Sequence, residues 1–482
     1  MFSRIKNLLF ENQNLHQSIA KNTFWLFFGQ IFGRLARVAI IIYAARILGP
    51  ASWGAFSYAT SLVAFLTIFT DIGISAIVTR ESAKSPEVSN KYFSTAFFIK
   101  SVLLMLGAVL LIFGAPIITK IEEVKSLLPV AALILIFDSL RNFGFTLGRA
   151  KEKMQWEGIN ETLTNVAISV LGFLFLWFYP NSLNLTISYA IATAIGFLLI
   201  VWRLKPYFSS LLTHFDYQLV KPILEMAWPI ALAGSLGAIM INTDIVMLGW
   251  LRTPEELGFY SAAQRPVQFL YILPALFAVS LFPVFTKLAK TSREEFKKIL
   301  ENSLKIVFLA ALPITFGGII LGDQLINLFF GPAYQNSIAS FQILLGTILI
   351  VFPSAIINNA ILAHDQQKRF IAFSLVGTIG NVFFNFLLIP SFGIAGCAAA
   401  TLFTQIIANS LMWKKLKEIS EFEIWNKIKK PLTAAVLTAI TTALLKTLGL
   451  NLIFNLGIAI IAYLLILKFQ KEELFSFSNF RN

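Results

Sequence analysis

Residues 287–322 read KLAKTSREEFKKILENSLKIVFLAALPITFGGIILG, a basic segment followed by a long apolar one. The apolar part, from roughly 304 to 322, has the length of about 20 residues that a helix needs to cross the hydrocarbon core of a bilayer. The basic part carries six Lys and Arg residues between positions 287 and 305. A basic segment beside an apolar span is typical of a transmembrane helix that begins at a cytoplasmic loop.

The same alternation extends along the 482 residues of the chain. Its composition agrees, with 13% charged residues against about 25% in soluble domains. We therefore predict an all-α polytopic membrane protein with about fourteen transmembrane helices. The predicted spans lie at roughly 22–45, 53–79, 93–118, 127–147, 159–179, 185–202, 222–250, 258–286, 304–322, 338–363, 370–389, 393–413, 431–448 and 450–467.

The distribution of positive charge predicts how the chain is oriented. Of the 39 Lys and Arg residues, 29 lie in the two tails and in every second gap between spans, whereas the alternate gaps hold five. Short loops rich in Lys and Arg remain in the cytoplasm. We therefore expect a multi-pass protein of the cell (inner) membrane with both termini in the cytoplasm. Placement beside the spans also explains the net charge of +14 through anionic lipid headgroups, so we expect no nucleic-acid partner.

A weak internal repeat divides the chain. Residues 54–59 read GAFSYA and residues 258–263 read GFYSAA, 204 positions later, and each follows a short turn that contains a proline, Pro50 or Pro254. The offset covers six spans, so two halves would insert the same way up, related by an axis along the membrane normal. A chance match of small and aromatic residues is the alternative. The predicted organisation is a cytoplasmic amphipathic segment, two pseudo-symmetric six-helix lobes, and a C-terminal helix pair with a tail: 1–21, 22–205, 206–415 and 416–482.

Signatures of catalysis are missing from the sequence. It contains no P-loop, no dinucleotide-binding glycine motif, no HExxH, no CxxC and no GxSxG. His16, His214 and His364 fall in cytoplasmic loops without metal-ligand spacing, and the single cysteine, Cys397, excludes an internal disulfide. We expect no enzyme and no cofactor. A membrane glycosyltransferase or polysaccharide polymerase is the alternative from another class, but the external gaps offer few acidic residues and little room.

Two arginines inside the first span are the strongest candidates for ligand binding. Ionisable side chains inside spans are costly and usually face a cavity or a partner. Arg34 and Arg37 lie three residues apart on one helix face, and Gln30 lies four residues before Arg34 on that face. Two like charges on one face indicate a watery cavity that binds an anion. The alternative is that they pair with Asp71 or Asp138.

Other charged residues inside spans have two interpretations each. Asp138 and Arg141, three residues apart in the fourth span, can neutralise each other within one helix. Asp244 lies in the outer part of the seventh span, and Arg265 lies at similar depth in the eighth. They can form a salt bridge, or Asp244 can belong to a site for a coupling ion.

Polar residues of the eleventh and twelfth spans lie at comparable depth. Asn381 and Asn385 are one helical turn apart, and Thr401 follows in the next span. Buried amides more often hold helices together than bind ions. This cluster therefore has an ordinary structural interpretation beside a functional one.

Several stretches resemble a known family of transporters. The sequences YAARILGP and WGAFS, DIGI running on to RE, and DIVMLG with GFYSAA are similar to bacterial and archaeal Wzx-type flippases of lipid-linked oligosaccharides. These stretches are residues 43–50, 53–57, 71–74, 80–81, 244–249 and 258–263. The resemblance covers nearly the whole chain. Wzx-type flippases share a superfamily with lipid II flippases and multidrug and toxin extrusion antiporters.

The resemblance implies a mechanism and a cargo. Two six-helix lobes would enclose a cavity that opens alternately to each side of the membrane. The cargo would be a polyprenyl-pyrophosphate-linked oligosaccharide, with its pyrophosphate held by Arg34, Arg37, Gln30 and Arg265. The expected partners are this lipid, membrane lipids and the polysaccharide polymerase machinery, and the chain is expected to act as a monomer. A lipid II flippase is a close alternative, whereas a multidrug antiporter for cations fits two cavity arginines poorly.

The resemblance also implies a sodium site. Lipid II flippases bind sodium with an aspartate on the seventh span, two polar residues four apart on the eleventh, and a backbone carbonyl and a threonine on the twelfth. The matching positions are Asp244, Asn381, Asn385, Cys397 and Thr401. Asn385 departs from the pattern, which has a second aspartate there, and this lowers the negative charge of the site. The coupling ion is accordingly expected to be Na⁺ or H⁺.

Overall fold

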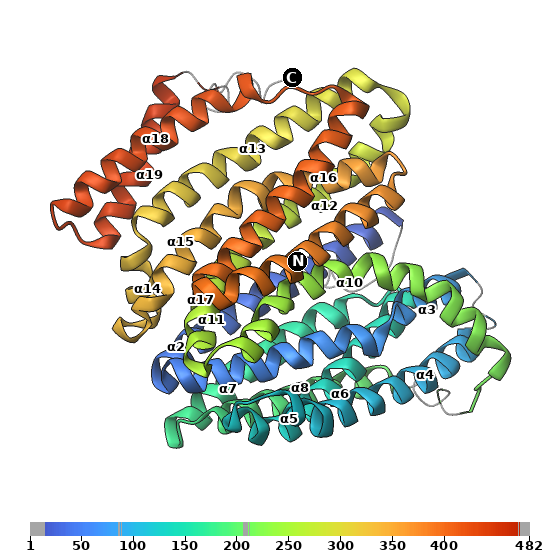
Figure 1. The fold of residues 1–482 in the computed structure, drawn as a ribbon. Helices are drawn as coiled ribbons and strands as arrows, with labels where there is room; N and C mark the ends of the chain where they lie inside the picture. The colour runs from blue at the N-terminus through green and yellow to red at the C-terminus, as the bar shows by residue number, and fades with distance from the viewer. Residues whose placement is uncertain are drawn as a thin grey trace, which may run out of the picture. The chain divides into compact units, whose positions relative to one another are not determined.

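The computed structural model describes residues 15–84, 87, 89–205, 211, 213–470 and 472, with side chains for all of these except 15–24, 26–30, 34, 229–230 and 233–234. Over these ranges the secondary structure is helical and contains no strand (Figure 1). The predicted all-α fold is therefore confirmed. The chain divides into two compact units, Met1–Gly258 and Phe259–Asn482.

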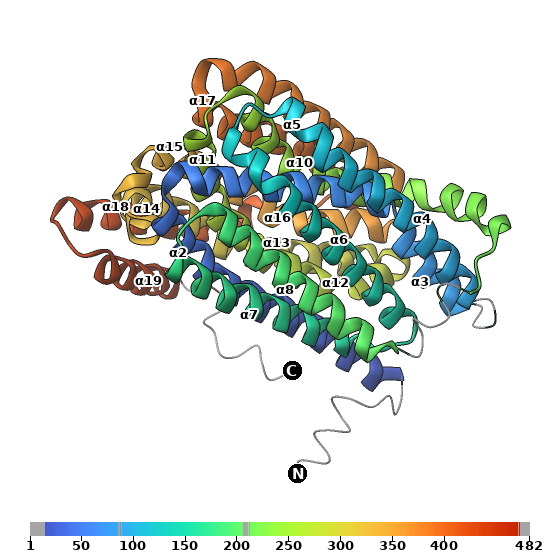
Figure 2. The same cartoon turned by 90° about the horizontal axis from the view of Figure 1, so that it is seen from below.

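The first unit is built on a long helix that packs along its neighbours. Helix α2 packs most extensively on α7, and it also contacts α6 and α10 (Figures 1 and 2). A core of apolar side chains from α3, α4, α6, α8 and α10 fills the unit near its basic loops. In chain order the elements are α2 (Leu15–Asp71), α3 (Ile74–Lys84), α4 (Ser89–Val109), the π-helix η1 (Leu110–Gly114), α5 (Ala115–Ile118), α6 (Glu122–Ala150), α7 (Gln155–Phe178), α8 (Ser182–Arg203), the 3₁₀-helix η2 (Tyr217–Leu219) and α10 (Val220–Leu251).

Helix α2 consists of two arms joined at a glycine. The backbone leaves the helical conformation at Gly49, which has φ 72° and ψ 173°. Glycine adopts a positive φ without the steric cost that a Cβ atom imposes, and Pro50 follows directly. The break falls in the predicted gap between the spans 22–45 and 53–79. The two predicted spans are therefore the two arms of α2, the second of which continues into α3.

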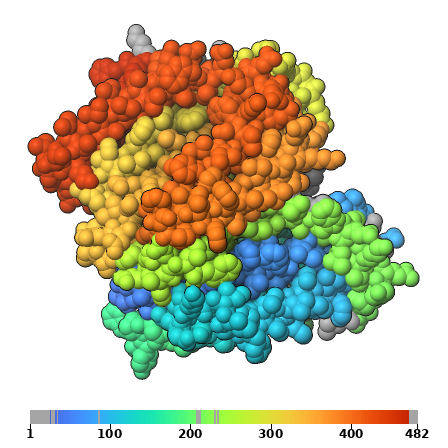
Figure 3. Space-filling view, in the orientation of Figure 1, coloured from blue at the N-terminus to red at the C-terminus, as the bar shows by residue number. Residues whose placement is uncertain are grey.

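The second unit contains the remaining helices. Helix α11 (Pro254–Leu270) begins in the first unit and ends in the second. Figure 3 shows the surface of this unit in yellow to red. Within the unit, α12 packs on α16, and α13 packs on both α16 and α18. The other elements are α12 (Ile272–Thr291), α13 (Arg293–Ile320), α14 (Gly322–Phe330), the 3₁₀-helix η3 (Pro332–Ser337), α15 (Ile338–Gly346), α16 (Ile348–Ala363), α17 (Gln367–Ser420), α18 (Trp425–Thr447) and α19 (Leu452–Phe469).

Helix α17 folds back on itself at Gly393, where φ is 58° and ψ is −137°. The Asn381 amide donates to the Thr401 hydroxyl at 3.4 Å. In a straight helix two residues 20 positions apart are separated by about 30 Å. Gly396 packs directly against the carbonyl oxygen of Leu388, which brings the two arms into backbone contact. The arms correspond to the predicted spans 370–389 and 393–413.

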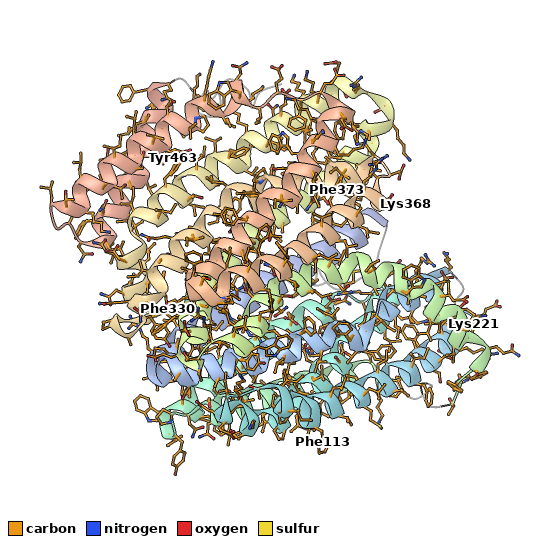
Figure 4. The ribbon with its side chains drawn as sticks, in the orientation of Figure 1. Phe113, Lys221, Phe330, Lys368, Phe373 and Tyr463 are labelled. Carbon is orange, nitrogen blue, oxygen red and sulfur yellow. The ribbon has the colours of Figure 1, made fainter. Side chains whose placement is uncertain are left out.

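The segment 287–322 contains the end of α12, all of α13 and the first residue of α14. The Ser292 hydroxyl caps α13 by accepting from the Glu295 amide at 3.3 Å, and two glutamates in the first turn suit the helix dipole. The helix therefore begins eleven residues before the predicted span and includes the basic residues from Arg293 onward, whereas Lys287 and Lys290 lie in α12. Tyr463, labelled in Figure 4, extends from α19 and donates to the Leu309 carbonyl of α13 at 3.0 Å.

Nine helices among the described residues are long and apolar enough to cross a membrane, or ten when Ile31–Asp71 and Ile74–Lys84 are taken as one bent span. Each of the fourteen predicted stretches is mostly helical, although 53–79, 258–286 and 338–363 are interrupted at residues 72–73, 271 and 347. Helix α17 counts once although it has two arms. The number fourteen therefore stays a prediction. The boundary at 205/206 between two six-helix lobes also stays a prediction. The first compact unit extends in sequence to Gly258, and within it α10 packs on α2 and α3.

Candidate functional site

Arg37 is held between three helices of the first unit. Small residues bring the first arm of α2 against α7: a Cβ on Gly33 would lie 2.8 Å from the Asn165 amide nitrogen, and the Ser169 hydroxyl donates to the Ala36 carbonyl at 2.8 Å. The next residue, Arg37, points toward α8, where its guanidinium carbon lies 5.2 Å from the centre of the Tyr189 ring. A cation above an aromatic face is stabilised by the ring quadrupole.

At least one hydrogen-bond donor of Arg37 is unused within the described part of the chain. Its Nε is buried and has no hydrogen-bond partner, and among the described side chains it forms no ion pair. A guanidinium carries five N–H donors in a planar fork that matches the oxygens of a phosphate. The side chains of Gln30 and Arg34 lie outside the described residues, although both positions belong to α2.

The carboxylates considered as partners for the two arginines are engaged elsewhere. Asp71 pairs with Lys100, whose side chain is 2% exposed, and accepts from the Ser75 hydroxyl. Asp138 accepts from the Arg141 guanidinium at 2.7 Å. The proposed pairing of Arg37 with either aspartate is therefore wrong, and the neutralisation of Asp138 by Arg141 is confirmed.

Arg141 also binds a second carboxylate, which was not predicted from the sequence. Its Nη1 lies 3.1 Å from Oε2 of Glu161 on α7, and its side chain is 7% exposed. Desolvation of a charge is costly, so a buried guanidinium is retained where it has close partners. The sequence feature that could have indicated this partner is Glu161 itself, a carboxylate just inside the predicted span 159–179. Glu161 also accepts a hydrogen bond from the Asn165 amide at 3.1 Å.

Asp71 marks a break between α2 and α3. Ile72 and Gly73 have φ of 36° and 78°, and a Cβ on Gly73 would lie 2.5 Å from the Ala227 carbonyl oxygen of α10. The Lys100 pair therefore sits at a backbone turn that is packed directly on a neighbouring helix. Asp71, Ile72 and Gly73 lie in the DIGI stretch, residues 71–74, which carries part of the family resemblance.

The second unit contains four of the five predicted sodium ligands, and three of them are hydrogen-bonded in a chain. The Asn385 amide donates to Asn381 Oδ1 at 3.1 Å, and the Asn381 amide donates to the Thr401 hydroxyl. Both asparagines and Cys397 are fully buried, and Cys397 is one helical turn before Thr401. Amide, hydroxyl and carbonyl oxygens suit a hard cation. The Asn381–Thr401 hydrogen bond also has a structural role, because it joins the two arms of α17.

Asp244 and Arg265 belong to different compact units. Asp244 is 1% exposed on α10 in the first unit. Arg265 lies on α11 in the second unit. Both the salt bridge between them and the contribution of Asp244 to a sodium site therefore stay predictions. Within the described ranges no three His, Cys, Asp or Glu side chains gather as a metal site.

The fold and these buried charges define a multi-pass helical membrane protein with ionisable side chains inside its spans. Residues 19–289 match the family described as polysaccharide biosynthesis protein, and the chain belongs to this family. The relationship to Wzx-type flippases predicted from the sequence is thereby confirmed.

Relatives extend the match over most of the chain. It is 22% identical over 400 residues to the capsular polysaccharide biosynthesis protein CapF of Staphylococcus aureus, covering 81% of this chain and 97% of CapF. It is 24% identical over 422 residues to a putative O-antigen transporter of Shigella flexneri, covering 84% of this chain and all of the relative. A solved structure of the lipid II flippase MurJ in an inward closed conformation has a TM-score of 0.78 and 18% identity, covering 93% of this chain and 99% of MurJ. At this identity the structural likeness concerns the fold.

Proposed function

We propose that the protein is a flippase that moves a polyprenyl-pyrophosphate-linked oligosaccharide from the cytoplasmic to the outer leaflet by alternating access. The observation that carries the proposal is Arg37, a cation on a membrane helix that forms no ion pair among the described side chains. Its family and its relatives, which are named for capsular polysaccharide and O-antigen, support a saccharide cargo.

The chemistry of such a cargo explains why cations are needed inside spans. A pyrophosphate and a glycan cannot cross hydrocarbon unaided, because each charge and hydroxyl would lose its water. Arg34 and Arg37 would replace that water with charge-assisted hydrogen bonds to the phosphate oxygens. Gln30 and Arg265 would add further donors. The prenyl chain would remain in the lipid, so the protein provides binding and movement, and no catalytic step.

The proposal includes a location and an orientation. The 29 basic residues of the tails and alternate gaps favour a cell membrane with both tails in the cytoplasm. Cargo made on the cytoplasmic face would then enter from the side of the basic loops. A monomer suffices for this movement, and polysaccharide polymerase machinery on the outer face is the expected recipient.

Reconstitution tests the function directly. In proteoliposomes that contain a fluorescent polyprenyl-pyrophosphate oligosaccharide, the protein should make the inner-leaflet glycan accessible to an enzyme added outside. Lipid II and an organic cation, tested in the same vesicles, examine the two alternatives within the superfamily. If the protein moves only lipid II, or only the cation, the proposed cargo is wrong and that molecule is the substrate.

Ion coupling is a separate part of the proposal. We infer that Na⁺ or H⁺ binds at Asp244 with Asn381, Asn385, Thr401 and the Cys397 carbonyl. With sodium as the ion, transport at fixed pH should rise with the sodium concentration, and Asp244→Asn should remove this dependence because the site loses its only carboxylate. The matched control is Asp365→Asn, since Asp365 is exposed in a turn with φ 58°, a conformation that asparagine also adopts.

The same measurement separates the two ions. If the transport rate is independent of the sodium concentration but depends on pH, and the pH dependence disappears in Asp244→Asn, the coupling ion is H⁺. Transport that ignores both ions and is unchanged in Asp244→Asn makes the aspartate a structural residue, and the coupling proposal is then wrong.

A further inference from the structure

A line of polar side chains runs between the two arms of α17, inside the second unit. Asn381 of the first arm donates to the Thr401 hydroxyl of the second arm at 3.4 Å, so these two helix faces meet. Side chains three or four residues apart share one face of a helix, and further polar residues follow at this spacing on both arms. We call the six residues the polar seam: Thr378, Asn381, Asn385, Thr401, Thr404 and Gln405.

The polar seam extends from the predicted sodium ligands toward the cytoplasm. Helix α17 begins and ends beside basic segments, residues 368–369 and 414–417, which the charge distribution places on the cytoplasmic side. Its turn at Gly393 therefore lies toward the outer side. Thr404 follows Thr401 by three residues, about 4.5 Å along the helix. It is the next polar position of the second arm on the cytoplasmic side of the predicted ligands.

The hydroxyl of Thr404 is buried and unpaired within the described part of the chain. A threonine inside a helix can donate to the carbonyl one turn earlier, as Thr378 does to Ser374 at 3.0 Å. The Thr404 side chain is 2% exposed, and its Oγ1 has no hydrogen-bond partner among the described residues. This oxygen lies close to the first arm, since a Cβ on Gly380 would be 3.9 Å from it.

Helix association alone does not explain this hydroxyl. Polar side chains that hold membrane helices together do so through hydrogen bonds between the helices, as in the Asn381–Thr401 pair. A buried unpaired hydroxyl costs free energy, because its lost hydrogen bonds to water are not replaced. A ligand that approaches Oγ1 of Thr404 would replace them, and the lone pairs of a hydroxyl suit a small hard cation.

We propose that Thr404 is a second binding position for Na⁺, which passes along the polar seam between the predicted ligands Asn381 and Thr401 and the cytoplasm. A cation that has left water needs an oxygen ligand at each step inside a span. Passage also requires several positions that each bind weakly enough for release, and neutral amide and hydroxyl oxygens meet this condition. The Gln405 side-chain oxygen, which accepts from Asn409 at 2.8 Å, continues the line. The inference rests on the sodium coupling proposed above.

Sodium exchange tests the second position. In proteoliposomes with Na⁺ on both sides, uptake of radioactive Na⁺ measures passage, and the rise of thermal stability with the sodium concentration measures binding at equilibrium. Thr404→Val replaces the hydroxyl with a methyl group. This variant should slow the exchange about tenfold, because the barrier rises equally in both directions. The half-saturating sodium concentration should stay within about twofold of the native value.

Two further variants serve as controls. Thr404→Ser keeps the hydroxyl and should retain most of the exchange. Thr441→Val removes the hydroxyl of an exposed threonine on α18, which donates to the Leu437 carbonyl of its own helix at 3.0 Å, and should change neither measurement. Thermal unfolding without sodium checks that each variant is folded.

The outcomes separate the second position from the coupling itself. Exchange at the native rate in Thr404→Val, or a fall that Thr404→Ser shares, would refute the second position and leave the sodium coupling standing. Equilibrium binding that weakens in proportion to the slower exchange would make Thr404 a ligand of the first site instead. If sodium neither stabilises nor exchanges through the native protein, the coupling and the second position are both wrong, whereas the flippase function is judged by cargo movement.

Discussion

Export of the lipid-linked oligosaccharide should fall about a hundredfold when Arg37 is replaced by alanine. A charged hydrogen-bonding partner that is lost from a desolvated site costs about 2–5 kcal/mol, and about 2.7 kcal/mol corresponds to a factor of one hundred. The buried Nε of Arg37 has no partner in the described protein, so its loss leaves no protein carboxylate unpaired. The variant should therefore accumulate normally in the membrane while export, measured as surface polysaccharide in a deletion strain, is lost.

Four further variants separate the possible causes of a loss of export. Arg37→Lys should retain part of the export when a point charge suffices, and little when the planar fork is needed. Tyr189→Phe keeps the aromatic face and should have a small effect. Lys120→Ala removes an exposed positive charge from an outer gap and serves as the matched control. Normal export by the double variant Arg34→Ala, Arg37→Ala would refute the role of both residues.

The helical architecture could be predicted because the bilayer imposes it. Each apolar stretch of sufficient length must satisfy its backbone hydrogen bonds internally, so it becomes a helix whatever its neighbours are. Helix boundaries are less constrained. Helix α13 extends beyond its apolar stretch, through basic residues, to its cap at Ser292. The apolar stretch ends where the membrane ends, but the helix can continue into water. The turn at Gly49 falls in the predicted gap between two spans, whereas the turn at Gly393 coincides with the first residue of the predicted span 393–413.

The contacts inside the first unit could not be predicted in the same way. Asp138 and Arg141 are close in sequence, so their pairing follows from helix geometry. The second partner of Arg141, Glu161, comes from another helix, and the Asp71–Lys100 pair joins α2 to α4. Such pairs depend on how the helices are rotated and how closely they pack, and small residues set how closely two helices can approach. At Gly196, for example, a Cβ would lie only 3.0 Å from Cδ of Arg141.

Arg141 is therefore expected to support stability, in contrast to Arg37. Arg141→Met removes a buried cation and leaves the Asp138 and Glu161 carboxylates partly buried and facing each other. Breaking a buried ion pair by removing one partner typically costs about 3–5 kcal/mol. The purified variant should lose its fold at a clearly lower temperature in a thermal-unfolding assay in detergent. The matched control is Arg203→Met, since Arg203 is exposed and stacks on Trp156 at the end of α8.

Neutral partners should reverse the defect when charge is its cause. In the Arg141→Met background, Glu161→Gln should restore part of the lost thermal stability, because one of the two unpaired carboxylates disappears. In the native background the same Glu161→Gln substitution should destabilise the protein, because Arg141 then keeps only Asp138. A double variant no more stable than Arg141→Met would attribute the defect to lost packing against Gly196 and Phe145 instead of charge.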